Sequence, residues 1–395
     1  MMQGSVVIVG GGVMGAATAC FLARDHRVAV TVLERDPTYR RASSALSASS
    51  IRQQFSQPVN IQLSQWSVQF LRRVADELAV DGEPPAIGLV EPGYLYLATN
   101  AGVPALQRHH QTQRQHGADV ALLTKFDLRQ RFDWLHAGDV ALASLGLSGE
   151  GWFDGPALMQ AFRRKAIHCG ARFVNANAVG FDVQADGSPS MRSVRSVRAA
   201  DGSAWPADQV LLAAGAWVAP LAAQLRVSLP VVAKKRDVFV FDSPAALPGC
   251  PLVVDPSGLW FRPEGRGFIC GAPPRDADPD EPALDGIDHA QFEEQLWPAL
   301  AHRVPGFEAL RLRSAWAGYY DMNTVDHNGL AGALPGWCNV FTACGFSGHG
   351  MQQAPAVGSA LAAMMTGGHS DAPGLQALSP QRLLDGRTLR EDNVI

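Results

Sequence analysis

The chain has 395 residues, of which 47% are hydrophobic and 18% charged, and its formal net charge is −4. This composition is typical of a folded globular protein, and the length favours two closely packed domains. The slight negative charge and the scattered Lys and Arg residues argue against a nucleic-acid partner. The six cysteines show no C-x-x-C pair and no metal-ligand spacing, so we expect reduced thiols in the cytoplasm and no metal site. The longest apolar run, 210–223, is too short to span a bilayer, so we expect no transmembrane segment.

The first predicted elements are a strand at Ser5–Val9 and a helix at Val13–Arg24, which is rich in small residues. The pattern G-x-G-x-x-G lies between them, as Gly10, Gly12 and Gly15. The first glycine permits a tight turn, the second lets backbone approach a pyrophosphate, and the third lets the helix pack on the strand. The helix N-terminus would face the phosphates with its partial positive charge. A glycine-rich turn that only packs is the alternative.

A second predicted strand, Val28–Leu33, ends in Glu34. The carboxylate of Glu34 is placed where it can accept hydrogen bonds from an adenosine ribose. A polar segment with seven serines from Ser43 to Ser64 follows, and a helix is predicted to begin near Pro58 or Asn60. The order of strand, glycines, helix, strand and acid predicts dinucleotide binding, and the serine-rich segment is suited to lie along a long cofactor.

Further strands are predicted downstream. Gln209–Ala214 reads as a buried strand, and Gly215 follows it at a point of close backbone approach. Three other segments, Gly93–Thr99, Arg236–Asp242 and Leu259–Pro273, are typical of an antiparallel sheet, and the last two would form a hairpin-rich platform over the cofactor.

Four motifs together resemble the D-amino-acid oxidase and sarcosine oxidase superfamily of FAD enzymes. They are the glycine motif, "LLAAGAW" at 211–217, "WAGYYDMNTVDHNGLAG" at 316–332 and "GFSGHGMQQAP" at 345–355. Within this family, "SSIRQQFSQPVNIQLS" at 49–64 and the pair Gln352-Gln353 are most similar to the branch of the mitochondrial FAD-dependent oxidoreductase-domain protein linked to assembly of respiratory complex I. The resemblance covers nearly the whole chain.

The resemblance implies an α/β fold in which a Rossmann-like FAD-binding domain is interleaved with an α+β substrate domain built on a mainly antiparallel sheet. The FAD-binding domain would comprise 1–87, 146–226 and 320–380. The substrate domain would comprise 88–145 and 227–319, followed by a tail at 381–395.

The resemblance also implies which residues hold FAD. The expected cofactor residues are Gly10, Gly12, Val13, Met14, Gly15, Glu34, Arg35, Ser43, Ser44, Ser49, Ser50, Ile51, Val179, Ala214, Gly215, Trp217, Gly348, His349, Gly350, Met351 and Gln352. The last five lie where the family places a helix N-terminus against the flavin pyrimidine, whose reduction leaves negative charge that backbone N–H groups stabilise. His349 has a role beside the flavin or is a structural histidine at the helix start. A metal is disfavoured there because only His349 and Cys344 could serve as ligands.

Such a flavin site is suited to hydride transfer from a carbon that bears an amine, and the substrate carboxylate needs a cation. Arg52 is the first candidate for that cation, and Arg262 and Lys235 follow; each could instead be a surface or structural cation. Tyr320, His349 and Gln352 complete the expected catalytic residues.

Departures from the family's pattern narrow the prediction. By alignment, Tyr319 and Tyr320 replace both the carboxylate-binding arginine of glycine-oxidase-like members and the cysteine that attaches FAD in monomeric sarcosine oxidases. Gln352 and Ile269 replace two lysines of the latter enzymes. We therefore expect noncovalent FAD, and the electron acceptor is O2 or another carrier.

The predicted function is oxidation of the C–N bond of a small N-substituted amino acid by hydride transfer to flavin N5, after which water hydrolyses the imine. A flavin-bound assembly or interaction protein with little turnover is the alternative from another class. Oxidation of a D-amino acid or a 2-hydroxy acid is a further alternative.

Overall fold

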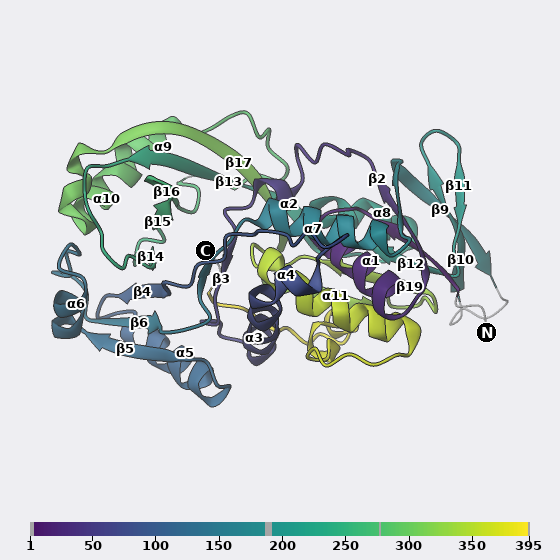
Figure 1. The fold of residues 1–395 in the computed structure, drawn as a ribbon, viewed down its shortest axis with the longest axis horizontal. Helices are drawn as coiled ribbons and strands as arrows, with labels where there is room; N and C mark the ends of the chain where they lie inside the picture. Colours follow the sequence, from purple (N-terminus) through teal and green to yellow (C-terminus); the bar gives the residue numbers. More distant parts are fainter. Residues whose placement is uncertain (1–3, 186–191, 276–277, 394–395) are drawn as a thin grey trace.

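The computed structural model describes residues 4–185, 192–275 and 278–393. Its two large sheets lie toward opposite ends of the molecule's long axis (Figure 1). One sheet has six strands in the order β18-β19-β12-β1-β2-β8, and the other has eight in the order β17-β13-β16-β15-β14-β4-β6-β5. The predicted α/β class, with a Rossmann-like part and a mainly antiparallel sheet, is confirmed.

The six-stranded sheet is parallel except for β18, which runs antiparallel to β19. Its strands are β1 (Ser5–Val9), β2 (Ala29–Glu34), β8 (Arg172–Asn175), β12 (Gln209–Leu212), β18 (Leu330–Ala333) and β19 (Val340–Cys344). The strand predicted at Ser5–Val9 is confirmed. The next one begins a residue later than predicted and includes Glu34, whereas β12 ends at Leu212, two residues early, because a 3-10 turn begins at Gly215.

Helices cover one face of this sheet. They are α1 (Val13–Asp25), α3 (Pro58–Arg72), α4 (Val74–Glu77), α7 (Gly155–His168) and α11 (Gly350–Thr366). The small residues of α1 permit close helix packing, since a Cβ added to Gly358 of α11 would lie 2.8 Å from the Cβ of Ala17. Alternate β1 side chains, Val6 and Ile8, pack against this helical layer.

A small three-stranded sheet and α8 (Val218–Gln224) cover the opposite face. The strands of the small sheet are β9 (Ala178–Ala185), β10 (Arg192–Ala199) and β11 (Ala204–Pro206). The other β1 side chains, Val7 and Val9, lie in one hydrophobic cluster with Val194 and Val197 of β10. Both faces of the parallel sheet are therefore buried, which explains why β1 is apolar at consecutive positions.

The eight-stranded sheet is antiparallel except for the pair β14–β4. Its strands are β4 (Tyr94–Ala98), β5 (Val120–Thr124), β6 (Leu142–Gly146), β13 (Val231–Asp242), β14 (Leu252–Val254), β15 (Trp260–Glu264), β16 (Gly267–Gly271) and β17 (Arg311–Asn323). The three segments predicted as antiparallel strands are confirmed, and 259–273 forms the β15–β16 hairpin. The domain boundary proposed between 319 and 320 falls within β17, so this strand would belong to both domains.

Shorter elements complete the chain. They are α2 (Ser43–Leu46), β3 (Ser50–Ile51), α5 (Val103–Gln115), α6 (Lys125–Arg131), β7 (Gly151–Trp152), α9 (His289–Gln291), α10 (Trp297–Arg303) and α12 (Gln381–Leu384). All six cysteines are free. Within the described ranges, every helix is too short or too polar to cross a bilayer.

Residues 381–393 pack onto the body of the molecule. The buried carboxylate of Glu391 accepts hydrogen bonds from the backbone N–H of Ser56 (2.8 Å) and Gln57 (3.2 Å) and from Nδ2 of Asn60 (2.9 Å). It thereby binds the backbone N–H groups of the two residues that directly precede α3. We name residues 385–393 the C-terminal strap, because they run from the end of α12 to the loop before α3 and form hydrogen bonds with it.

Candidate active site

A cavity of about 970 Å³ is lined by residues of both halves of the molecule. Its wall, as far as the described residues form it, combines the β1–α1 turn, the end of β2, the segment 39–52, strands β13, β15 and β17, and the loop before α11. The cavity is at the upper end of the size range of ligand sites in proteins, as a long cofactor together with a small substrate requires.

The β1–α1 turn requires its glycines. Gly10 has φ +104°, and a Cβ there would lie 2.4 Å from the carbonyl oxygen of Ala213 on the neighbouring strand. A Cβ on Gly15 would lie 2.0 Å from the carbonyl oxygen of Gly10, so this glycine allows α1 to pack rather than lining the cavity. Gly12 is the N-cap of α1 and lines the cavity. The backbone at the start of α1 is therefore accessible to an anionic group.

Glu34 is held in place at the end of β2. One carboxylate oxygen accepts the backbone N–H of Gly11 (2.8 Å), and the other accepts that of Asp36 (2.9 Å). The hydroxyl of Ser44 accepts the N–H of Val13 (2.9 Å) and so brings the serine-rich segment to the N-terminus of α1. An oriented carboxylate, a helix N-terminus and serine hydroxyls on one cavity wall fit the ribose and pyrophosphate of FAD.

Most residues predicted to hold FAD line this cavity. They are Gly10, Gly12, Val13, Met14, Glu34, Arg35, Ser43, Ser44, Ser49, Ser50, Val179, Ala214, Gly215, Trp217, Gly348, Gly350, Met351 and Gln352. Gly15, Ile51 and His349 lie outside its wall. The guanidinium of Arg35 stacks over the Trp217 ring at 3.9 Å, and Val179 is 44% exposed.

The loop before α11 brings backbone into the cavity. Gly348 has φ +93°, and a Cβ there would lie 2.4 Å from the ring of Tyr320, so only glycine fits against this tyrosine. His349 points elsewhere: it is 2% exposed and packs edge-on against Phe55 at 5.4 Å. Burial lowers the pKa of His349 to about 3, so the ring is neutral. Its ring contacts Phe55 and Phe346, and neither ring nitrogen has a hydrogen-bond partner among the described residues.

Two of the three predicted cations reach the cavity. Arg52 and Arg262 line it, each only 4% exposed. Arg52 donates to the carbonyl oxygens of Gln54 (2.8 Å) and Asn393, and Arg262 donates to that of Ala48 (2.7 Å). Lys235 lies outside the wall, where its ammonium bonds to the carbonyl oxygen of Gly286 and pairs with Asp237 at 3.3 Å.

The cavity wall also contains residues that the sequence analysis did not select. Four of them bear on the chemistry of the site: Arg236 of β13, Asp321 of β17, Tyr94 of β4 and Trp260 of β15. Arg236 is paired in two places with the carboxylate of Asp278, at 3.1 and 3.0 Å. Asp321 could have been selected from the sequence, because it directly follows Tyr320 within the motif at 316–332.

Glu150 forms hydrogen bonds with the two residues that follow Arg52. This fully buried carboxylate accepts the backbone N–H of Gln53 (2.6 Å) and the side-chain amide of Gln54 (2.8 Å). Burial raises the pKa of Glu150 to about 7, because the charged form loses its water, although the hydrogen bonds partly oppose this effect.

The raised pKa of Glu150 makes stability depend on pH. An acid whose pKa is higher in the folded than in the unfolded chain destabilises the fold once it ionises, so the free energy of unfolding should fall by roughly 3 kcal/mol as pH rises from about 4.5 to about 7. Glu150→Gln is neutral throughout and should lose this slope. Urea unfolding of both proteins at about pH 5 and about pH 8 measures it; parallel pH dependences would contradict the prediction.

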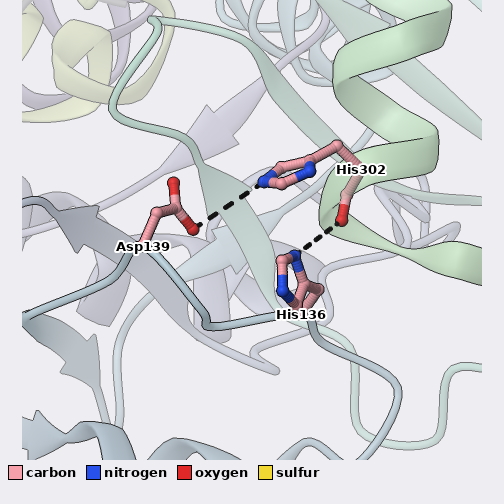
Figure 2. A group of neighbouring side chains, drawn as sticks. All are labelled: His136, Asp139 and His302. Atoms are coloured by element: carbon pink, nitrogen blue, oxygen red, sulfur yellow. Dashed lines mark hydrogen bonds and ion pairs between the residues drawn. The ribbon is translucent and has the colours of Figure 1, made fainter.

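One group of possible metal ligands occurs among the described residues, namely His136, Asp139 and His302 (Figure 2). A ring nitrogen of His302 lies 3.9 Å from Asp139, and Nδ1 of His136 lies 3.2 Å from the carbonyl oxygen of His302. Arg303 already donates to both carboxylate oxygens of Asp139 at 2.9 Å. A metal ion would therefore bind next to a fixed positive charge, and the ion pair accounts for this group without a metal.

Comparisons with known proteins agree with this geometry. The family model "DAO: FAD dependent oxidoreductase" matches residues 5–364. The "FAD-dependent oxidoreductase domain-containing protein 1" of Xenopus laevis is 42% identical over 100% of this chain and 85% of its own length, and the glycine oxidase of Geobacillus kaustophilus is 29% identical over 90% and 91%. The crystal structure of L-proline dehydrogenase from P. horikoshii matches with a TM-score of 0.85 at 23% identity, over 98% of this chain and 99% of that one. The chain therefore belongs to the DAO family of FAD-dependent oxidoreductases.

Proposed function

We propose that this protein oxidises the C–N bond of a small amino acid that carries a secondary amine, such as N-methylglycine or N-carboxymethylglycine. The observation that carries the proposal is that Arg52 lines the same cavity as the glycine turn and Glu34. FAD, which is bound noncovalently, supplies the hydride acceptor for such a reaction. The residues of the chain must then bind the amino acid, orient it and exclude water.

The proposed role of Arg52 is to bind the substrate carboxylate. Its guanidinium is held by the carbonyl oxygens of Gln54 and Asn393, and its backbone N–H donates to Oε1 of Gln352 at 2.9 Å. These contacts satisfy only part of its donor capacity, because an arginine offers N–H groups on three nitrogens. A rigidly held cation with remaining donors is suited to orient a carboxylate.

The walls around Arg52 favour a small substrate. Four large side chains line the cavity together with Arg52, namely Tyr94, Tyr320, Trp260 and Gln352, and we infer that they restrict the room left for a substrate. The likeness to a glycine oxidase, a relative named for a small amino acid, supports the same size class. We propose the cytoplasm as the compartment, consistent with six free cysteines.

Anaerobic mixing of the FAD-loaded protein with a substrate panel tests the proposal. We expect N-methylglycine or N-carboxymethylglycine to bleach the flavin fastest. Faster bleaching by D-alanine or by a 2-hydroxy acid would replace the proposed substrate class. If nothing on the panel bleaches the flavin, a flavin-bound interaction protein with little turnover becomes the better assignment.

The role of Arg52 has its own test. Arg52→Ala should weaken substrate affinity roughly thirty-fold or more, because a charge-assisted hydrogen bond is lost. Arg52→Lys keeps a charge but not the planar donor geometry, so its affinity should lie between those of the parent and the alanine variant. The dependence of the flavin-reduction rate on substrate concentration gives these affinities. Parental affinity in an FAD-loaded Arg52→Ala protein would remove the assignment.

A further inference from the structure

Asp321 places a carboxylate in the wall of the active-site cavity. It lies on β17, paired with Ala233 of β13, and directly follows Tyr320. One carboxylate oxygen accepts the backbone N–H of Phe346 at 3.3 Å, and the backbone oxygen of Asp321 accepts the N–H of Ser347 at 3.1 Å. The carboxylate is thus held between β17 and the loop that leads into α11, where the chain borders the flavin site.

No Lys, Arg or His side chain of the described residues forms an ion pair with Asp321. Three arginines of the cavity wall have other partners: Arg236 is paired with Asp278, Arg262 is paired with Glu264, and Arg52 donates to backbone carbonyl oxygens. The titratable group that interacts with Asp321 is Cys344 of β19, whose thiol pKa is raised mainly by burial and also by the charge of Asp321. Tyr320, the preceding residue of β17, has Arg236 and Arg52 as its charged neighbours.

The surroundings leave the carboxylate ionised at neutral pH but weakly solvated. Burial raises the pKa of Asp321 to about 6, and backbone N–H groups of the 345–346 turn oppose this shift. A poorly solvated carboxylate without a cationic partner is unfavourable, and a cation bound in the cavity would relieve that cost. Because arginines occupy other parts of the wall, the site offers both a cationic and an anionic contact to a ligand.

We propose that Asp321 binds the ammonium group of the amino-acid substrate and accepts its proton. This inference rests on the proposed function, since it names the group that recognises and prepares the amine. In the step, one N–H bond of the ammonium breaks and one O–H bond forms on the Asp321 carboxylate; no electrons are transferred. The product is a neutral amine whose lone pair can support loss of hydride from the adjacent carbon. A ligand without an ammonium leaves the carboxylate unpaired, so Asp321 also selects against 2-hydroxy acids.

Two ligands of nearly equal shape test the inference on the FAD-loaded protein. N-methylglycine carries the amine, and methoxyacetate has an ether oxygen in its place. In Asp321→Asn, the affinity for N-methylglycine should fall roughly thirty-fold or more, whereas that for methoxyacetate should stay equal or rise. For a ligand that does not reduce the flavin, the change in flavin absorbance on titration gives the affinity. For a ligand that reduces the flavin, the dependence of the reduction rate on ligand concentration gives the affinity. An equal fall for both ligands would overturn the inference.

Two further variants separate charge from structure. The asparagine oxygen can still accept the N–H of Phe346, so the loop before α11 should keep its position. Asp321→Glu keeps the charge and should retain the preference for the amine over the ether. This variant still tests the inference if Asp321→Asn loses FAD. Asp242→Asn is the matched control, because Asp242 lies at the other end of β13, outside the cavity, where it is half-buried and paired with Arg313, and this variant should behave like the parent.

The pH dependence gives a second readout. The affinity of the parent for N-methylglycine should rise with pH through about 6, as Asp321 ionises, and Asp321→Asn should lack this rise. A parental rise in the asparagine variant would contradict the inference. If the amine preference depends on Asp321 but no amine bleaches the flavin, the proposed oxidation fails while the binding role stands. If amines bleach the flavin equally in the parent and in Asp321→Asn, the proposed oxidation stands and the role of Asp321 fails.

Discussion

Glu34→Lys is expected to raise the dissociation constant of FAD by at least about a hundredfold, which corresponds to roughly 2.7 kcal/mol. The carboxylate of Glu34 is fixed by the N–H groups of Gly11 and Asp36 and lines the cavity. A lysine would remove the acceptor for the ribose hydroxyls and replace it with a donor. Titration of the apoprotein with FAD, followed by flavin fluorescence, measures the change.

Two variants make the FAD result interpretable. Glu34→Gln keeps one acceptor oxygen, so its loss of FAD affinity should be smaller than that of the lysine variant. Glu308→Lys makes the same charge reversal at an exposed position outside the cavity and should bind FAD like the parent. If Glu34→Lys is folded and binds FAD with parental affinity, Glu34 does not contact the ribose.

Arg382→Ala should lower the free energy of unfolding by roughly 3 to 5 kcal/mol, because it leaves a buried carboxylate without its cation. Arg382 donates to both carboxylate oxygens of Asp326 at 3.1 Å, and the two side chains are 4% and 0% exposed. Asp326 also accepts the N–H of Leu389 (2.9 Å), so this ion pair helps to fix the middle of the C-terminal strap. Urea unfolding of the purified variant measures the loss.

The matched control lies on the same segment. Arg387→Ala removes an exposed pair with Asp385, which should cost about 0.5 kcal/mol or less. Because Glu391 and Asn393 of the strap bind Gln57 and Arg52, Arg382→Ala should also weaken substrate affinity, whereas Arg387→Ala should not. Equal stability of the two variants would exclude a structural role for the Asp326–Arg382 pair.

The residues predicted to bind the adenosine and pyrophosphate of FAD could be found from the sequence because they are close together along the chain. Gly10, Gly12 and Glu34 act within one strand–helix–strand unit, so their spacing along the chain fixes their spacing in space. The Gly348–Gln352 turn is expected from the resemblance to the FAD enzyme family, which is carried by residues that are neighbours in sequence. Most predicted strand boundaries shifted by at most two residues, whereas β13 begins at Val231 and not at the predicted Arg236, because β-branched and apolar runs mark a strand better than they mark its ends.

The glycine turn and the acid at the end of β2 could be predicted from the residues alone, because each depends on neighbours along the chain, and the resemblance to a family predicted the α/β class and the turn before α11. The tertiary structure, in contrast, fixes what each polar side chain contacts. It brings Asn393 to Arg52 across 341 residues of sequence, buries His349 against Phe55, turns Lys235 away from the cavity and leaves Asp321 facing into it. Burial and partners of this kind depend on the packing of distant segments, and the spacing of residue types does not encode that packing.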